Sequence, residues 1–117
     1  MIRIKKLFAS KGEKVIPFFT AGFPQKSDTV NLVRAAEFAG ASMIELGMPF
    51  SDPLADGPII QQASQVAIEN GVTIQWILET VGEIRNFSEI PIVLMGYINP
   101  IIKFGLGFAA ILIFLIV

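Results

Sequence analysis

Three carboxylates, Glu45, Asp52 and Asp56, lie within the stretch MIELGMPFSDPLADGP, residues 43–58, in which only one other side chain is polar. Charged residues make up 16% of the 117-residue chain, so three acids in one apolar stretch call for an explanation. Carboxyl groups can transfer protons or stabilise a developing positive charge, and two of them in different environments can divide these tasks. This stretch therefore predicts a site of acid–base chemistry.

Glu45 is the strongest candidate because it stands between Ile44 and Leu46 in a run that predicts a buried strand. In a strand its side chain points away from both neighbours, and an ionised carboxylate is costly to bury unless it is paired. Desolvation is expected to raise the pKa of Glu45 towards neutrality, where a carboxyl group can both give and take a proton. A structural ion pair with a lysine or arginine is the alternative, and position alone does not choose between them.

Asp52 and Asp56 have a simpler interpretation when each is taken alone. Asp-Pro and Asp-Gly are common turn sequences, and an aspartate just before Pro58 can cap a helix that starts there. The loop between the strand and this helix is nevertheless long for such a connection, and long ordered loops are often functional. Such a loop can fold back over Glu45 and bring a second carboxylate to the same pocket.

Aromatic and sulphur-containing side chains could line an apolar pocket beside these acids. The candidates are Phe18 and Tyr97, with Phe19, Phe50 and Met95 in addition. Core packing is the simpler interpretation for most of them. The chain has no Cys and no His, which excludes disulfides, thiolate nucleophiles and histidine bases. No metal site is expected, and no glycine-rich phosphate loop of the GxGxxG or GxxxxGK form is present.

Apolar runs and capping residues predict the elements that position these side chains. Strands are expected at 15–21, 41–46 and 90–97. Helices are expected at 3–10, from Ser27 or Asp28 to Phe38, at 58–69, and in the segment after Thr73. Trp76, on the last of these helices, is expected to anchor it against the barrel. Strands that are apolar throughout and separated by helices indicate a parallel sheet with right-handed crossovers.

Two architectures fit this order, a doubly wound open sheet and a (β/α)₈ barrel. Barrels collect polar functional residues at the carboxyl ends of their strands. Thr20, Glu45 and Tyr97 end the three predicted strands, and this pattern favours the barrel.

Charge and hydropathy limit the partners and the location of the protein. The net charge is −1, so no basic face predicts binding to nucleic acid or to a membrane. The N-terminus lacks the apolar core of a signal peptide, and a cytoplasmic protein is expected. Residues 1–104 carry every charge and predict one domain, whereas residues 105–117, GLGFAAILIFLIV, form a separate apolar tail that is too short to span a bilayer.

The stretch IELGMPFSDPLADGP resembles, over its whole length, the signature of the tryptophan synthase alpha subunit. PFFTAGFP, GVT and PIVLMGYINPI agree with the same family, and the resemblance covers residues 1 to about 106. It implies an α/β fold, namely the N-terminal part of a (β/α)₈ TIM barrel with about three parallel strands and intervening helices.

The implied enzyme is a lyase of L-tryptophan biosynthesis that cleaves indole-3-glycerol phosphate by a retro-aldol reaction to indole and glyceraldehyde 3-phosphate. The resemblance makes Glu45 the general acid–base, and it makes Asp56 the group that binds the indole N–H. It places Phe18 and Tyr97 against the substrate. The alpha subunit has no cofactor, since pyridoxal phosphate belongs to the beta subunit, which is the expected partner in an alpha2beta2 assembly. Pro49 and Asp52 lie in the loop that faces this partner.

The chain departs from the family after INPIIKFGL, where a polar helix and further strands with the substrate-phosphate site are expected. The apolar tail instead suggests a frameshift, a truncated gene or an engineered end, and this chain alone is expected to be inactive. The alternative function is that of a non-catalytic barrel fragment that associates with a partner chain through its exposed strand edges.

Overall fold

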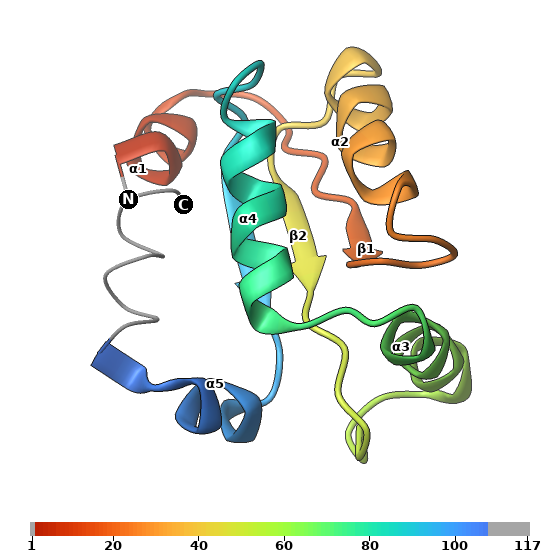
Figure 1. Cartoon of the computed structure of the whole chain (residues 1–117). Helices are drawn as coiled ribbons and strands as arrows, with labels where there is room; N and C mark the ends of the chain where they lie inside the picture. The colour runs from red at the N-terminus through yellow and green to blue at the C-terminus, as the bar shows by residue number, and fades with distance from the viewer. Residues whose placement is uncertain (1, 108–117) are drawn as a thin grey trace.

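The computed structural model describes residues 2–107, in which three parallel strands form one sheet with helices packed around it (Figure 1). The elements in chain order are α1 (Ile2–Ala9), β1 (Phe18–Thr20), α2 (Asp28–Phe38), β2 (Ile44–Gly47), α3 (Pro58–Glu69), α4 (Ile74–Ile84), β3 (Ile92–Met95) and α5 (Ile98–Phe104). Helices α2 and α4 pack against each other over the sheet, and α3 contacts β1.

The register of the sheet assigns its side chains to two faces. Strand order is β1-β2-β3, which is also the order along the chain, and both pairs are parallel. Phe18, Glu45 and Val93 are aligned across the three strands, and so are Thr20, Gly47 and Met95 two residues later. Because side chains alternate along a strand, these six residues share one face of the sheet.

The opposite face packs against the helices and forms the core. Ile44, Leu46 and Ile92 of the sheet are completely buried there, together with Val33 of α2 and Val81 of α4. Full burial of an aliphatic side chain of this size stabilises a fold by about 1.5–3 kcal/mol. Trp76 is partly buried and packs against this cluster, as predicted. The core therefore holds the sheet rigid from one side and leaves the other face available.

Most of the predicted helices are confirmed, and their termini follow the sequence signals. Helix α3 runs from Pro58 to Glu69 as predicted, and the hydroxyl of Thr73 caps α4 by accepting the Trp76 N–H at 3.1 Å. Ser27 precedes α2, but its side chain makes no capping hydrogen bond. Helix α5 was not predicted; its Pro100 is tolerated because the first N–H groups of a helix have no intrahelical partner.

The strands are shorter than predicted. Residues just before β1 and β3 join the sheet only through carbonyl groups: Pro17 O accepts from Glu45 N and Pro91 O from Ile44 N. Proline has no N–H to donate, so the regular ladder begins after each proline. The third strand ends at Met95 rather than at residue 97, because Tyr97 is already the N-cap of α5.

The predicted apolar tail, residues 105–117, lies outside the described residues from position 108 onwards. Among residues 2–107, no helix has the length and apolar character needed to cross a membrane.

Candidate active site

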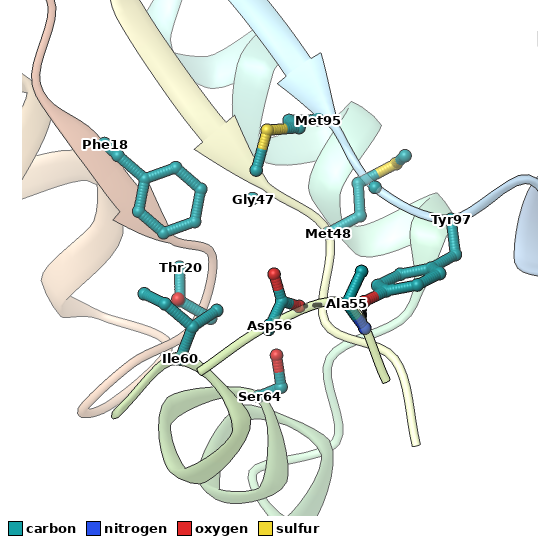
Figure 2. Close-up of a pocket in the computed structure, with 11 residues that line it drawn as sticks. Phe18, Thr20, Gly47, Met48, Ala55, Asp56, Ile60, Ser64, Met95 and Tyr97 are labelled. Atoms are coloured by element: carbon teal, nitrogen blue, oxygen red, sulfur yellow. Dashed lines mark hydrogen bonds between the residues drawn. The ribbon is translucent and has the colours of Figure 1, made fainter. Parts of the chain in front are cut away.

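A cavity of about 240 Å³ opens at the carboxyl ends of the three strands (Figure 2). Its size lies just below the range of about 300–1,000 Å³ that is typical of small-molecule sites. The residues around it come from all three strand ends, from the loop after β2 and from α3: Phe18, Thr20, Gly47, Met48, Ala55, Asp56, Ile60, Ser64, Met95, Gly96 and Tyr97. The cavity therefore lies where a barrel would place a site.

Asp56 lies in this cavity and is held there by Tyr97. The Tyr97 hydroxyl donates to Oδ2 of Asp56 at 3.2 Å and accepts the Ala55 N–H at 2.9 Å. The Tyr97 ring also packs on Phe50, with 5.1 Å between the ring centroids. Asp56 does not cap α3, whose N-cap is Gly57. Its carboxylate is thus oriented towards the cavity by a partner 41 residues away in the sequence.

The loop that carries Asp56 is further fixed by its own backbone and by α3. The side-chain amide of Gln61 donates to Asp56 O at 2.9 Å, and Asp56 N donates to Pro53 O at 3.0 Å. At the start of the loop, Met48 N donates to Met95 O at 2.7 Å. The loop is therefore anchored at both of its ends.

Glu45 lies on the same sheet face as the cavity but two residues before Gly47, towards the amino end of β2. It is half-buried and does not itself line the cavity. No hydrogen bond or ion pair joins its carboxylate to another residue in the 2–107 range, where the one salt bridge links Arg3 and Glu89. The described part of the chain thus gives no support to the alternative of a structural ion pair.

Two glycines shape the walls of the cavity, and sequence reasoning did not find them. A Cβ atom on Gly47 would lie 2.5 Å from Cζ of Phe18, and one on Gly96 would lie 2.7 Å from Cε of Met48. Both distances are far inside normal contact, so the Phe18 ring and the Met48 side chain occupy space that only glycine leaves open. The sequence signal is weak, since Gly47 follows a predicted strand and Gly96 lies inside one.

Two hydroxyl-bearing residues of the cavity were also not assigned to it from the sequence. Thr20 ends β1 and is 7% exposed, and Ser64 lies on α3 and is 4% exposed. Both line the cavity. A buried threonine and serine are easily taken for core residues when only the sequence is available.

Of the other predicted residues, only Met95 lines the cavity. Phe19 faces the core, whereas Met95 lines the cavity as suggested. Pro49 is half-buried and Asp52 is exposed, and the Asp52 carboxylate accepts a hydrogen bond from Ser51 Oγ at 2.9 Å. Within residues 2–107, no three acidic side chains come together as ligands for a metal ion.

Comparison with known proteins points to one family. The family model described as "Tryptophan synthase alpha chain" matches residues 4–111. A tryptophan synthase alpha chain from Parabacteroides distasonis is 43% identical over 106 residues, and one from Chloroflexus aggregans is 50% identical over 111 residues. These alignments cover 90% and 91% of this chain but 41% and 42% of the relatives, so the chain spans about two fifths of their length.

Solved structures agree with the sequence relatives. The alpha subunit of tryptophan synthase from Legionella pneumophila superposes with a TM-score of 0.86 at 36% identity, over 93% of this chain and 42% of that one. A chain of the tryptophan synthase a2b2 complex from Pyrococcus furiosus superposes with a TM-score of 0.74 at 46% identity, and the match covers 79% of this chain and 37% of that one. The neighbours are TIM barrels, so the three strands are the N-terminal part of a (β/α)₈ barrel, as predicted.

Proposed function

Because the chain belongs to the tryptophan synthase alpha chain family, we propose that its site serves the retro-aldol cleavage of indole-3-glycerol phosphate to indole and glyceraldehyde 3-phosphate. The observation that supports this most is the orientation of Asp56. A carboxylate directed by Tyr97 into a largely apolar cavity suits a planar, mostly apolar ligand that carries one hydrogen-bond donor.

Asp56 is proposed to accept the N–H of the indole ring. When the ring carbon is protonated, positive charge develops on this nitrogen, and a fixed carboxylate stabilises that charge most at the moment when it appears. Phe18 and Tyr97 are proposed to hold the two sides of the ring. Gly47 contributes by leaving room for Phe18 at the wall.

Glu45 is proposed as the proton carrier. Cleavage needs one proton added to the ring carbon that bears the side chain and one removed from the adjacent hydroxyl group, so that the carbon–carbon bond breaks and an aldehyde forms. A single carboxyl group can perform both transfers if it reaches both atoms. Its place on the cavity face, without an ion-pair partner among residues 2–107, leaves the carboxyl group available for this task.

The beta subunit of tryptophan synthase is proposed as the partner. The similar Pyrococcus structure is an a2b2 complex, and Pro49 and Asp52 stand outside the cavity in the loop after β2. The exposed Asp52 carboxylate is suited to a polar contact at the rim of an interface.

Indole binding by the 117-residue chain tests the role of Asp56. Asp56→Asn should weaken indole binding about tenfold or more, because hydrogen bonds to charged groups are worth about 1.5–3 kcal/mol. Asp52→Asn is the matched control, since it makes the same change in the same loop outside the cavity. Equilibrium dialysis measures the dissociation constant of indole for each variant. An equal loss of affinity in the two variants would contradict the proposal.

Cleavage tests the role of Glu45. The chain alone should show little turnover, because it spans about two fifths of its relatives. The substitution equivalent to Glu45→Gln is therefore best made in a full-length relative, where it should abolish cleavage and leave substrate binding largely intact. Near-normal turnover of that variant would exclude Glu45 as the proton carrier.

A second candidate function is non-catalytic association, which the strand edges favour. In the described part of the chain, β1 and β3 each have one edge without a strand partner, and such edges pair readily with other chains. Size-exclusion chromatography with light scattering tells an associated chain from a monomer. A monomer at micromolar concentration would argue against edge pairing.

A further inference from the structure

The hydroxyl groups of Thr20 and Ser64 are the polar groups of the cavity that the proposed chemistry does not use. Both residues are more than nine-tenths buried, and both line the cavity. Neither side chain forms a hydrogen bond with another residue in the 2–107 range. The other buried threonines and serine differ, since the hydroxyls of Thr29, Thr80 and Ser88 each have a backbone partner.

Each side chain is buried as a whole, but neither hydroxyl oxygen is among the fully buried side-chain atoms that lack a hydrogen-bond partner in the 2–107 range, so both oxygens open to the cavity. Figure 2 shows the Ser64 oxygen pointing from α3 towards Asp56, with Thr20 beside Phe18 at the end of the cavity opposite Tyr97. The two hydroxyls can therefore bond water or ligand atoms that occupy the cavity.

The ring of the proposed substrate cannot supply these partners. Indole has one polar atom, its N–H, and Asp56 is already proposed to accept it. The remaining polar atoms of the substrate lie on its side chain, which carries hydroxyl groups. A ligand hydroxyl can replace a bound water and reproduce its hydrogen bonds, whereas an alkyl group cannot.

We propose that Thr20 and Ser64 bind the hydroxyl groups of the substrate side chain and select hydroxylated over plain alkyl indoles. This inference rests on the proposed function, because it takes the ring to be bound by Asp56. A site that hydrogen-bonds a ligand hydroxyl discriminates strongly against the analogue that lacks it, since the protein groups then remain unpaired. Thr20 and Ser64 are in this sense specificity residues and not proton carriers.

Three probes test this inference on the purified 117-residue chain: indole, 1-(indol-3-yl)propane-1,2-diol, whose hydroxyls stand on the same carbons as in the proposed substrate, and 3-propylindole. The measured quantity is the ratio of the dissociation constants of the propyl compound and the diol, determined by competition dialysis. Thr20→Val and Ser64→Ala should each lower this ratio about threefold to tenfold, as expected for one lost hydrogen bond. The affinity for indole itself should change less than twofold.

Matched variants separate loss of the hydroxyl from loss of folding. Thr20→Ser keeps a hydroxyl and should keep the preference for the diol. Thr80→Val makes the same change as Thr20→Val at a buried threonine that bonds Trp76 O and lies outside the cavity, so it should leave the ratio unchanged. Circular dichroism checks that each variant is folded.

The inference is overturned if Thr20→Val and Ser64→Ala leave the ratio as it is in the wild type. If indole binding still depends on Asp56 in that case, the proposed function stands and only the hydroxyl contacts are wrong. If the ratio falls as expected while Asp56→Asn leaves indole binding unchanged, the hydroxyl contacts stand and the role of Asp56 is wrong. If none of the three probes binds, both the proposed function and the hydroxyl contacts are contradicted.

Discussion

Tyr97 and Asp56 are joined by a hydrogen bond of 3.2 Å that connects the N-cap of α5, two residues after β3, to the loop after β2. The same hydroxyl accepts the Ala55 N–H, so one oxygen atom fixes both the backbone of the loop and the direction of its carboxylate. Asp56 could act as a turn residue by itself, but this contact gives it a defined orientation in the cavity.

Tyr97→Phe should loosen the loop without emptying the cavity. The variant removes two hydrogen bonds and keeps the aromatic ring, and each bond contributes about 0.5–1.5 kcal/mol. Amide exchange at Ala55, measured by NMR, should become about tenfold faster or more. Phe50→Leu removes the ring contact but spares the hydroxyl, and should leave Ala55 protected. Equal exchange in wild type and Tyr97→Phe would show that the hydroxyl does not hold the loop.

Gly47→Ala should damage the cavity wall. The added methyl group would lie 2.5 Å from the Phe18 ring, which must then move, and such overpacking costs about 1–3 kcal/mol. Urea unfolding measures the loss. Gly82→Ala is the control: it lies inside α4 with nothing within 4 Å of its added methyl group, and it should stabilise the chain by about 0.5–1 kcal/mol. Similar effects of the two substitutions would refute the role assigned to Gly47.

Thr73→Ala should destabilise the chain by about 0.5–2 kcal/mol, because it removes the cap of α4. The comparison is Ser27→Ala at the start of α2, where the serine side chain makes no capping bond and a smaller loss is expected. Urea unfolding of both variants decides the matter, and the prediction fails if the serine variant loses as much stability.

The ion pair between Arg3 and Glu89 should make stability depend on pH. Arg3 donates a hydrogen bond to Glu89 at 2.6 Å and lowers the pKa of Glu89 below its ordinary value of 4.5. Since the folded pKa is lower than the unfolded one, the pair stabilises the folded chain above the unfolded pKa, and this contribution disappears as pH falls through the folded pKa.

Urea unfolding at neutral and acidic pH measures this dependence. Glu89→Gln should be slightly less stable than wild type at pH 7 and equal to it in acid, with a difference that shrinks in high salt. Glu13→Gln changes an exposed glutamate whose carboxylate has no partner among residues 2–107, and should show no such dependence. A difference that persists below the folded pKa would contradict the assignment.

The sequence was sufficient to predict the parallel sheet, the bounds of α3 and the cap of α4, because each depends on local signals: apolar runs, Pro58 and Thr73. It could not show that strand ends shorten where prolines supply only carbonyl groups. Helix α5 has no clear start signal in the sequence, because its N-cap Tyr97 makes no side-chain capping bond and Pro100 lies in its first turn.

The candidate acids of the site could be named from the sequence, but their arrangement could not. Glu45 and Asp56 stand out in apolar surroundings, whereas the bond between Tyr97 and Asp56 depends on the pairing of β2 with β3. Thr20 has a signal only as a polar residue at the end of a predicted strand, and Ser64 and Gly47 have no distinctive signal. The packing of β1, β2 and α3 brings all three to one cavity.

The separation of 41 residues between Asp56 and Tyr97 also has a consequence for synthesis on the ribosome. Chains grow at about 5–20 residues per second, so Asp56 emerges roughly 2–8 s before Tyr97. During that interval the loop after β2 has neither its hydrogen-bond partner nor the strand that anchors its first residue, and its aspartates face water. The nascent chain therefore acquires its carboxylates before it acquires the group that orients them.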